Sequence, residues 1–253
     1  MIPTQDELNS NTIIKRVDAD FVNVIDFNDI HLGAIKSNKR AVQKTVEFIQ
    51  STPNTFWIGG GDSTENAQIG SKSSPFDSET HGIDSILELR DILMPIRNSC
   101  LGIKDGNHGL KRAYRSNKLP PEQVLAELLS VRFVRGILGV MMNVRKNLYV
   151  LAAAHTTKKQ EASFDWLNFD AMFIEHQHTK HYNRLPIAYV NRGEKKWTVR
   201  DRLYLRSGSF LSWGGYAGEN YRPLISEGGQ ILQLSGITND WDMSVIERLR
   251  DFK

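Results

Sequence analysis

The sequence is organised around one stretch, which reads Phe21-Val22-Asn23-Val24-Ile25-Asp26-Phe27-Asn28-Asp29-Ile30-His31-Leu32-Gly33. Its first half is rich in apolar residues and predicts a buried strand, and Asp29 and His31 follow just past the end of that strand. In open α/β sheets, ligands bind beyond the carboxyl ends of the strands. A carboxylate and an imidazole two residues apart can bind one metal ion if the loop turns both inward. This stretch therefore predicts a strand that ends at a candidate metal site.

Four further apolar runs end in the same kinds of residue. The five sets, in chain order, are Asp29/His31, Asp62, Asn107/His108, His155 and His176/His178. One histidine after a strand is more often a surface residue than a metal ligand, but five of the seven histidines belong to these sets. Their coincidence favours a metal site. His81 and His181 lie outside the pattern and are expected in exposed loops, with His181 a candidate substrate contact.

The remaining pattern predicts an α/β N-terminal half and a β-rich C-terminal part within one domain, residues 1–253. Helices are expected over 38–50, with Asn38 as the cap, over 83–93, and from Pro120 onward. Strands are expected over 55–58, 100–103, 131–134, 139–144, 148–153 and 170–174. The glycines at 59–61 would let the backbone approach another group closely. Residues 1–20 are expected to form a polar, partly ordered N-terminal extension.

The C-terminal part, 185–253, is expected to hold β structure with a hairpin at Arg192-Gly193. The spacing of Met243, Ile246 and Leu249 predicts a short terminal helix.

Composition indicates a soluble globular protein. The 253 residues are 40% apolar and 24% charged, with a net charge of +3 that does not by itself imply nucleic-acid binding. The lone Cys100 excludes an internal disulfide and suits a reducing compartment. No signal peptide and no membrane-spanning run is visible, so the expected location is the cytoplasm, without membrane association.

The order of the motifs resembles that of the calcineurin-like metallophosphoesterases. The matching text is Asp29-Ile30-His31, Gly61-Asp62, Gly106-Asn107-His108, His155 and His176-Gln177-His178, and the resemblance covers roughly residues 21–210. It implies a β-sandwich flanked by helices, in four α/β/β/α layers. The Gly-Gly-Asp motif followed by Glu-Asn is also similar to the corresponding motif of phage-encoded members of the family. Two positions depart from the family: Glu175 replaces a glycine, and Glu65 stands where Asp or Asn is common. Glu175 could add negative charge near the site or point into solvent.

The resemblance further implies two divalent metal ions. Asp29, His31 and His178 would bind the first ion, and Asn107, His155 and His176 the second, with Asp62 bridging the two. Oxygen and nitrogen ligands without thiolate suit Mn²⁺, with Fe²⁺ or Zn²⁺ as alternatives. Two ions about 3.5–4 Å apart can activate a bridging water and hold the phosphoryl oxygens during in-line displacement.

The residues expected to act in catalysis are Asp62, Asn107 and His108. His108 is not needed as a metal ligand. It could protonate the leaving oxygen or stabilise the developing charge.

Basic residues follow four of the five ligand loops. They are Lys36, Lys39 and Arg40; Lys111, Arg112 and Arg115; Lys158 and Lys159; and Lys180 and Arg184. If they share one rim, that rim suits DNA or RNA; the alternative is an ordinary solvated surface. Lys111, Arg112, Arg115 and His181 are the candidate substrate-binding residues. Trp213, Tyr216 and Tyr221 could stack on bases or pack in the β-rich part.

Three functions remain open at this point. The first is a metal-dependent phosphoric ester hydrolase that cleaves nucleic-acid phosphodiester bonds. The second is a phosphoesterase of the same chemistry acting on a small nucleotide or a phosphoprotein. The third is a non-catalytic interaction module on the same fold, as in the retromer subunit of similar fold. Such modules normally lack some of the metal-binding residues, whereas every metal-binding residue is present in this sequence.

Overall fold

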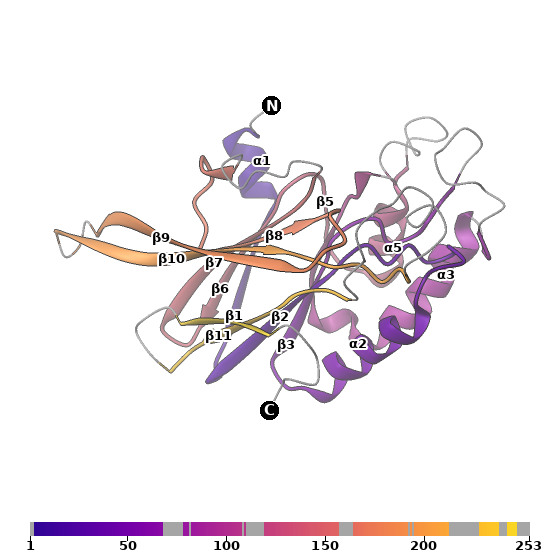
Figure 1. Cartoon of the computed structure of the whole chain (residues 1–253), viewed down its shortest axis with the longest axis horizontal. Coiled ribbons are helices and arrows are strands. Elements are labelled where there is room, and N and C mark those ends of the chain that lie inside the picture. Colours follow the sequence, from indigo (N-terminus) through magenta and orange to yellow (C-terminus); the bar gives the residue numbers. More distant parts are fainter. Residues whose placement is uncertain are drawn as a thin grey trace.

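The protein is described here from a computed structural model that covers residues 3–67, 78–80, 82–107, 109, 119–156, 164–191, 193, 195–212, 228–237 and 242–246. Its described strands form two six-stranded mixed sheets (Figure 1). Sheet A has the order β1 (Thr12–Val17), β6 (Leu138–Val144), β7 (Asn147–His155), β8 (Ala171–Glu175), β10 (Lys196–Arg206) and β9 (His181–Asn191). Sheet B has the order β12 (Met243–Ile246), β11 (Ile231–Ser235), β2 (Phe21–Phe27), β3 (Thr55–Gly59), β4 (Cys100–Lys104) and β5 (Phe133–Val134).

Strands β2, β3, β4 and β5 of sheet B run parallel to one another. Their carboxyl ends therefore meet at one edge of the sheet, as the sequence predicts. The glycines after β3 let the backbone pass close to other groups at this edge. A Cβ on Gly60 would lie 2.5 Å from the Glu175 carboxylate, and Gly61 has a φ of +93° and lies against the backbone of Gly106.

One core cluster lies between the two sheets and a second lies between sheet B and its helices, and the period-two alternation of β2 divides its side chains between them. Val22 and Val24 pack toward sheet A, while Ile25 and Phe27 pack toward the helices on the other face. Those helices are α2 (Lys39–Ser51), α3 (Gly82–Leu93), η2 (Met94–Ser99) and α5 (Pro121–Leu129), and they cover the outer face of sheet B (Figure 1). On the outer face of sheet A, Phe164 and Phe169 pack on the strands, and α1 (Gln5–Ser10) precedes β1. The predicted sandwich of two sheets flanked by helices is confirmed.

The N-terminal part is more ordered than the sequence indicated. Thr12–Val17 forms an edge strand that pairs with β6 in parallel along its whole length, from Thr12 opposite Gly139 to Val17 opposite Val144. Ile13 and Val17 pack against the core between the sheets. The alternation of apolar and polar residues in Thr12–Val17 is too short to predict a strand from the sequence, and the strand is recognised from its pairing with β6.

The prediction of a C-terminal helix is wrong over its described part. Met243–Ile246 forms β12, antiparallel to β11, and Leu249 lies outside the described residues. Met243 is buried and Val245 packs on the same cluster, so the apolar residues on the core face recur every two residues, as in a strand. The helix prediction rested on the three-residue spacing of Met243 and Ile246.

The predicted hairpin is confirmed, since β9 and β10 pair antiparallel from His181 opposite Arg206 to Asn191 opposite Lys196. Among the described residues, no helix is long and apolar enough to span a membrane.

Candidate metal centre

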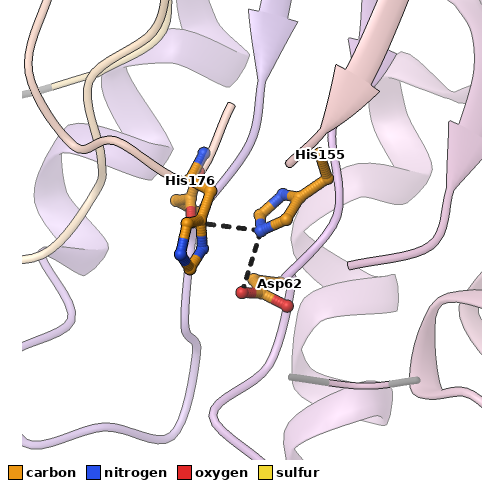
Figure 2. Close-up of side chains that lie close together, drawn as sticks. Asp62, His155 and His176 are labelled. Atoms are coloured by element: carbon orange, nitrogen blue, oxygen red, sulfur yellow. Dashed lines mark hydrogen bonds and ion pairs between the residues drawn. The ribbon is translucent and has the colours of Figure 1, made fainter. Parts of the chain in front are cut away.

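The predicted ligands come from strand ends of both sheets. Asp29, Asp62 and Asn107 follow the parallel strands β2, β3 and β4 of sheet B. His155 ends β7 of sheet A, and His176 and His178 follow the neighbouring parallel strand β8. Figure 2 shows Asp62 and His176 facing His155, although the three residues come from different segments of the chain. The topology therefore gathers five distant segments at one place.

Two groups of side chains in this region have the geometry of metal sites. The first is Asp29, Asp62, His155 and His176, and the second is Asp29, His31 and His178; within each group the ligand atoms all lie within 4.8 Å of one another. Asp29 Oδ1 lies 3.0 Å from His178 Nε2 and 3.5 Å from His31 Nε2. Asp29 thus belongs to both groups, whereas the family resemblance gives the bridging position to Asp62.

Asn107 completes the first group. Its Oδ1 lies 2.8 Å from His155 Nε2, and Asp62 Oδ2 lies 3.1 Å from the same nitrogen. His176 Nδ1 is buried and has no hydrogen-bond partner among the described residues. The structure therefore brings all seven predicted ligands together, and the donor set of oxygen and nitrogen atoms fits divalent ions such as Mn²⁺, Fe²⁺ or Zn²⁺.

The backbone is strained at these residues. Asp29, His31, Asp62, His176 and His178 have φ values of 48°, 47°, 46°, 81° and 57°, in the left-handed region that non-glycine residues rarely adopt. Such conformations cost of the order of 1 kcal/mol or more each and persist where the surrounding structure enforces them. Their concentration here indicates that the loops are shaped to turn these side chains inward.

Hydrogen bonds from outside the ligand set orient two of the imidazoles. His155 Nδ1 donates to the carbonyl of Gly60 at 3.0 Å, which leaves Nε2 as the nitrogen that faces Asp62 and Asn107. Glu65 Oε2 lies 2.9 Å from His31 Nδ1, and Nε2 of that ring faces Asp29. Carboxylates and carbonyls in this position raise the basicity of metal-binding histidines. Glu65, one of the two departures from the family pattern, is thus placed to orient His31.

The electrostatics of the centre favour added positive charge. Burial would lower the pKa of His31, but its contacts with Asp29 and Glu65 outweigh this and raise the pKa to about 10. Burial is likewise outweighed at His155, where Asp62 and Asp29 raise the pKa well above its ordinary value. A divalent ion would supply the positive charge that these raised pKa values favour, so metal binding and protonation would compete here.

Glu175, the other departure, is buried and faces the protein interior. Its carboxylate forms an ion pair with Lys104 Nζ at 2.8 Å, with both side chains fully buried, and lies 3.5 Å from His155 Nδ1. Burial and the Glu175 charge raise the pKa of Asp26 well above its ordinary value, and Ser207 donates to Asp26. Of the two alternatives for Glu175, the first holds: it adds charge beside the site and does not point into solvent.

Sequence reasoning missed Lys104 and Asp26. Asp26 lies within the largely apolar strand β2, and Lys104 is the last residue of β4; a charge in or at the end of such a strand is the signal that the sequence offered.

Glu122, at the start of α5, is also buried beside the centre. Its Oε1 accepts a hydrogen bond from the backbone N–H of Ser63, and burial together with the charge of Asp62 raises its pKa to about 7. A buried carboxyl of this kind binds a proton in the folded state at pH values where the unfolded chain has lost it.

We therefore expect wild-type stability to fall by about 3 kcal/mol from this group as pH rises from about 4.5 to about 7, since each pKa unit is worth about 1.4 kcal/mol. Glu122→Gln lacks this titration. The free energy of unfolding of the variant, relative to that of wild type, should rise by about 3 kcal/mol between pH 4.5 and pH 8. Urea unfolding of chelated wild type and variant across this range measures the difference. A difference that does not change with pH would contradict the expectation.

Several predicted residues lie outside the described part of the chain. They are His81, His108, Lys111, Arg112, Arg115, Lys158, Lys159, Trp213, Tyr216 and Tyr221. Of the described basic residues, Lys39 pairs with Glu88 at 2.8 Å and Arg184 pairs with Asp201 at 2.8 Å. His181 is exposed as expected, but it begins β9 and does not lie in a loop.

No protein-family model and no curated protein sequence matches the chain. Similar solved structures include Vacuolar Protein Sorting 29 from Cryptosporidium parvum, with 12% identity, TM-score 0.45, and coverage of 91% of this chain and 100% of the other.

Two other solved structures are similar to this chain. One is Vps29 complexed with zinc from Entamoeba histolytica, with 10% identity, TM-score 0.39, and coverage of 89% and 99% of the two chains. The other is a metallophosphoesterase from Sphaerobacter thermophilus, with 11% identity, TM-score 0.40, and coverage of 90% and 88%. At these identities and TM-scores the likeness carries no conclusion about function, which depends on the residues of this chain.

Proposed function

We propose that this protein is a metal-dependent phosphoesterase that uses two divalent ions, with Mn²⁺ as the favoured metal and Fe²⁺ or Zn²⁺ as alternatives. The observation that supports it most is the convergence of seven oxygen and nitrogen donors from five strand ends, on strained backbone and without a thiolate. A buried cluster of this kind needs positive charge, which protons supply when no metal is bound.

Each residue has a proposed role. Asp29, His31 and His178 would hold one ion, Asn107, His155 and His176 would hold the other, and Asp62 would serve both. When bound, the ions supply an activated water and neutralise charge on the phosphoryl oxygens. Glu65 orients the ring of His31, and the Gly60 carbonyl orients the ring of His155. His108 protonates the leaving oxygen or stabilises its charge.

The proposed substrate is a phosphodiester bond of DNA or RNA, and the proposed location is the cytoplasm, which suits the lone cysteine. Lys111, Arg112, Arg115 and His181 are proposed to contact the substrate. The positive charge concentrated on the β9–β10 hairpin supports a nucleic-acid substrate.

A panel of substrates tests the proposal. Chelated protein should be inactive on bis(p-nitrophenyl) phosphate, and added Mn²⁺ should restore turnover. With Mn²⁺, single- and double-stranded DNA and RNA are compared with p-nitrophenyl phosphate, a small nucleotide and a phosphopeptide. Cleavage of the oligonucleotides supports the nuclease proposal, while exclusive turnover of a small ester or phosphopeptide supports the second function. Folded, metal-loaded protein that turns over none of them would identify a non-catalytic module.

A further inference from the structure

The β9–β10 hairpin extends far from the body of the protein, as the orange arrows of Figure 1 show. Its base lies at the candidate metal centre. β9 begins at His181, three residues after His178, and β10 ends at Arg206, just before Ser207 and Ser209. Ser209 Oγ donates to the backbone carbonyl of Asp29 at 3.0 Å. The hairpin is therefore a continuous extension of the loops that hold the predicted ligands.

This hairpin carries the positive charge of the chain. Residues 181–206 contain seven Lys and Arg against two Asp and Glu, whereas the rest of the chain contains 25 against 27. The hairpin is thus +5 and the remainder is −2, although the whole chain is only +3. The Arg184–Asp201 pair neutralises one charge of each sign, which leaves the excess unchanged. A concentrated positive field on a projecting element attracts a polyanion.

One face of the hairpin exposes apolar side chains that nothing in the described chain covers. Trp197 is 71% exposed, and Val190, directly opposite it on β9, is 50% exposed. Val199, two residues along the same face, is 65% exposed. Lys195, two residues before Trp197, and Lys196, whose side chain points to the other face of the ribbon, are both exposed. An exposed indole flanked by ammonium groups can stack on a base while the lysines contact phosphates.

The opposite face of the hairpin is held by packing. The Arg200 guanidinium lies 4.6 Å from the centre of the Tyr189 ring, and that of Arg202 lies 4.6 Å from the centre of the Phe169 ring. Such cation–π contacts stiffen the ribbon and fix which face is presented. Eleven residues of β9 span about 35 Å, at about 3.3 Å per residue, so the ribbon is long enough for several nucleotides.

We infer that the β9–β10 hairpin is a docking arm for single-stranded nucleic acid, which leads the strand toward the candidate metal centre. This inference rests on the proposed function. A single strand fits better than a duplex because only unpaired bases can stack on Trp197. Addition of a strand from a second copy is disfavoured because Pro186, in the edge strand β9, has no N–H to donate. A membrane surface would use the same indole and lysines, and the experiment separates it.

Binding and turnover are measured separately. Fluorescence anisotropy in chelator, at fixed salt, reports binding of a labelled 20-mer of deoxythymidine to the full chain. Turnover of bis(p-nitrophenyl) phosphate with Mn²⁺ reports the centre alone. Trp197→Ala should weaken oligonucleotide binding about tenfold or more, and Lys195→Ala/Lys196→Ala should weaken it and reduce the dependence of the affinity on salt. Turnover of the small diester should not change in either variant.

Matched controls lie on other elements. Trp166→Ala removes a tryptophan that is 41% exposed outside the hairpin, and Lys44→Ala/Lys146→Ala removes two exposed lysines elsewhere. Both should bind the oligonucleotide like wild type.

Hairpin variants that bind like wild type would overturn the inference. So would wild type that binds anionic phosphatidylserine vesicles but no oligonucleotide. Weakened binding in the hairpin variants together with no metal-dependent turnover in any protein would support the arm and refute the proposed catalytic function.

Discussion

Asp62→Asn is expected to lower turnover of a phosphodiester by about 10³-fold, since the ions contribute several kcal/mol to the transition state and about 1.4 kcal/mol is a factor of ten. Asp62 Oδ2 lies 3.1 Å from His155 Nε2 in a buried cluster, and the amide removes one negative charge from that cluster. We expect the variant to hold fewer than two ions per chain by elemental analysis.

Asp91→Asn is the matched control, because Asp91 is 67% exposed on α3 and pairs with its neighbour Arg90. It should keep wild-type turnover and metal content. Two bound ions and normal turnover in Asp62→Asn would show that Asp62 is not a ligand.

Asp29→Asn adds a second comparison, because Asp29 belongs to both side-chain groups of the centre. If Asp62 bridges the ions, Asp62→Asn should lose affinity for both. If Asp29 does, the loss of both ions should appear in Asp29→Asn, and Asp62→Asn should keep one.

Lys104→Met is expected to reduce the free energy of unfolding by about 3–5 kcal/mol. Its ammonium is fully buried, 2.8 Å from Glu175, and also donates to the backbone carbonyls of Gly60 and Asp105. Removing it leaves the Glu175 carboxylate buried without its counter-charge, beside Asp26 and behind His155. Urea unfolding at neutral pH measures the loss.

The control for this prediction is Lys39→Met. Lys39 forms an ion pair of the same length, 2.8 Å, with Glu88, but it is 41% exposed. We expect a loss below about 1 kcal/mol, because exposed ion pairs contribute little. Lys104→Met/Glu175→Leu should recover most of the stability lost in Lys104→Met, since an apolar pair can replace a buried ion pair. Equal losses in Lys104→Met and Lys39→Met would contradict the account of the buried pair.

Local pattern was enough to predict most of the fold and the members of the site. The apolar run of β2 and the polar residues just after it identify both a strand and its functional end, because parallel strands bring their carboxyl ends to one edge. The same reasoning works for the runs that end in Asp62, Asn107 and His155. The Asn38 cap and the buried face of α2 also follow from local rules, and the Asn38 side chain accepts a hydrogen bond from the Ala41 N–H as expected.

Features that depend on a distant partner could not be predicted. Glu175 lies 71 residues from Lys104, and nothing local shows that the two are paired. The strand β1 is recognisable only beside β6, and β12 only beside β11. Glu65 was visible as a departure from the family, but its contact with His31, 34 residues away, required the fold.

The most direct test of the account is the number of Mn²⁺ ions that exhaustively chelated protein binds, measured by equilibrium dialysis with elemental analysis and compared with turnover of bis(p-nitrophenyl) phosphate in the same samples. We expect two ions per chain, with turnover absent before loading and restored as the ions bind. Full turnover in the chelated protein, or no bound Mn²⁺ in folded wild type, would contradict the assignment of the cluster around Asp29 and Asp62 as a metal centre.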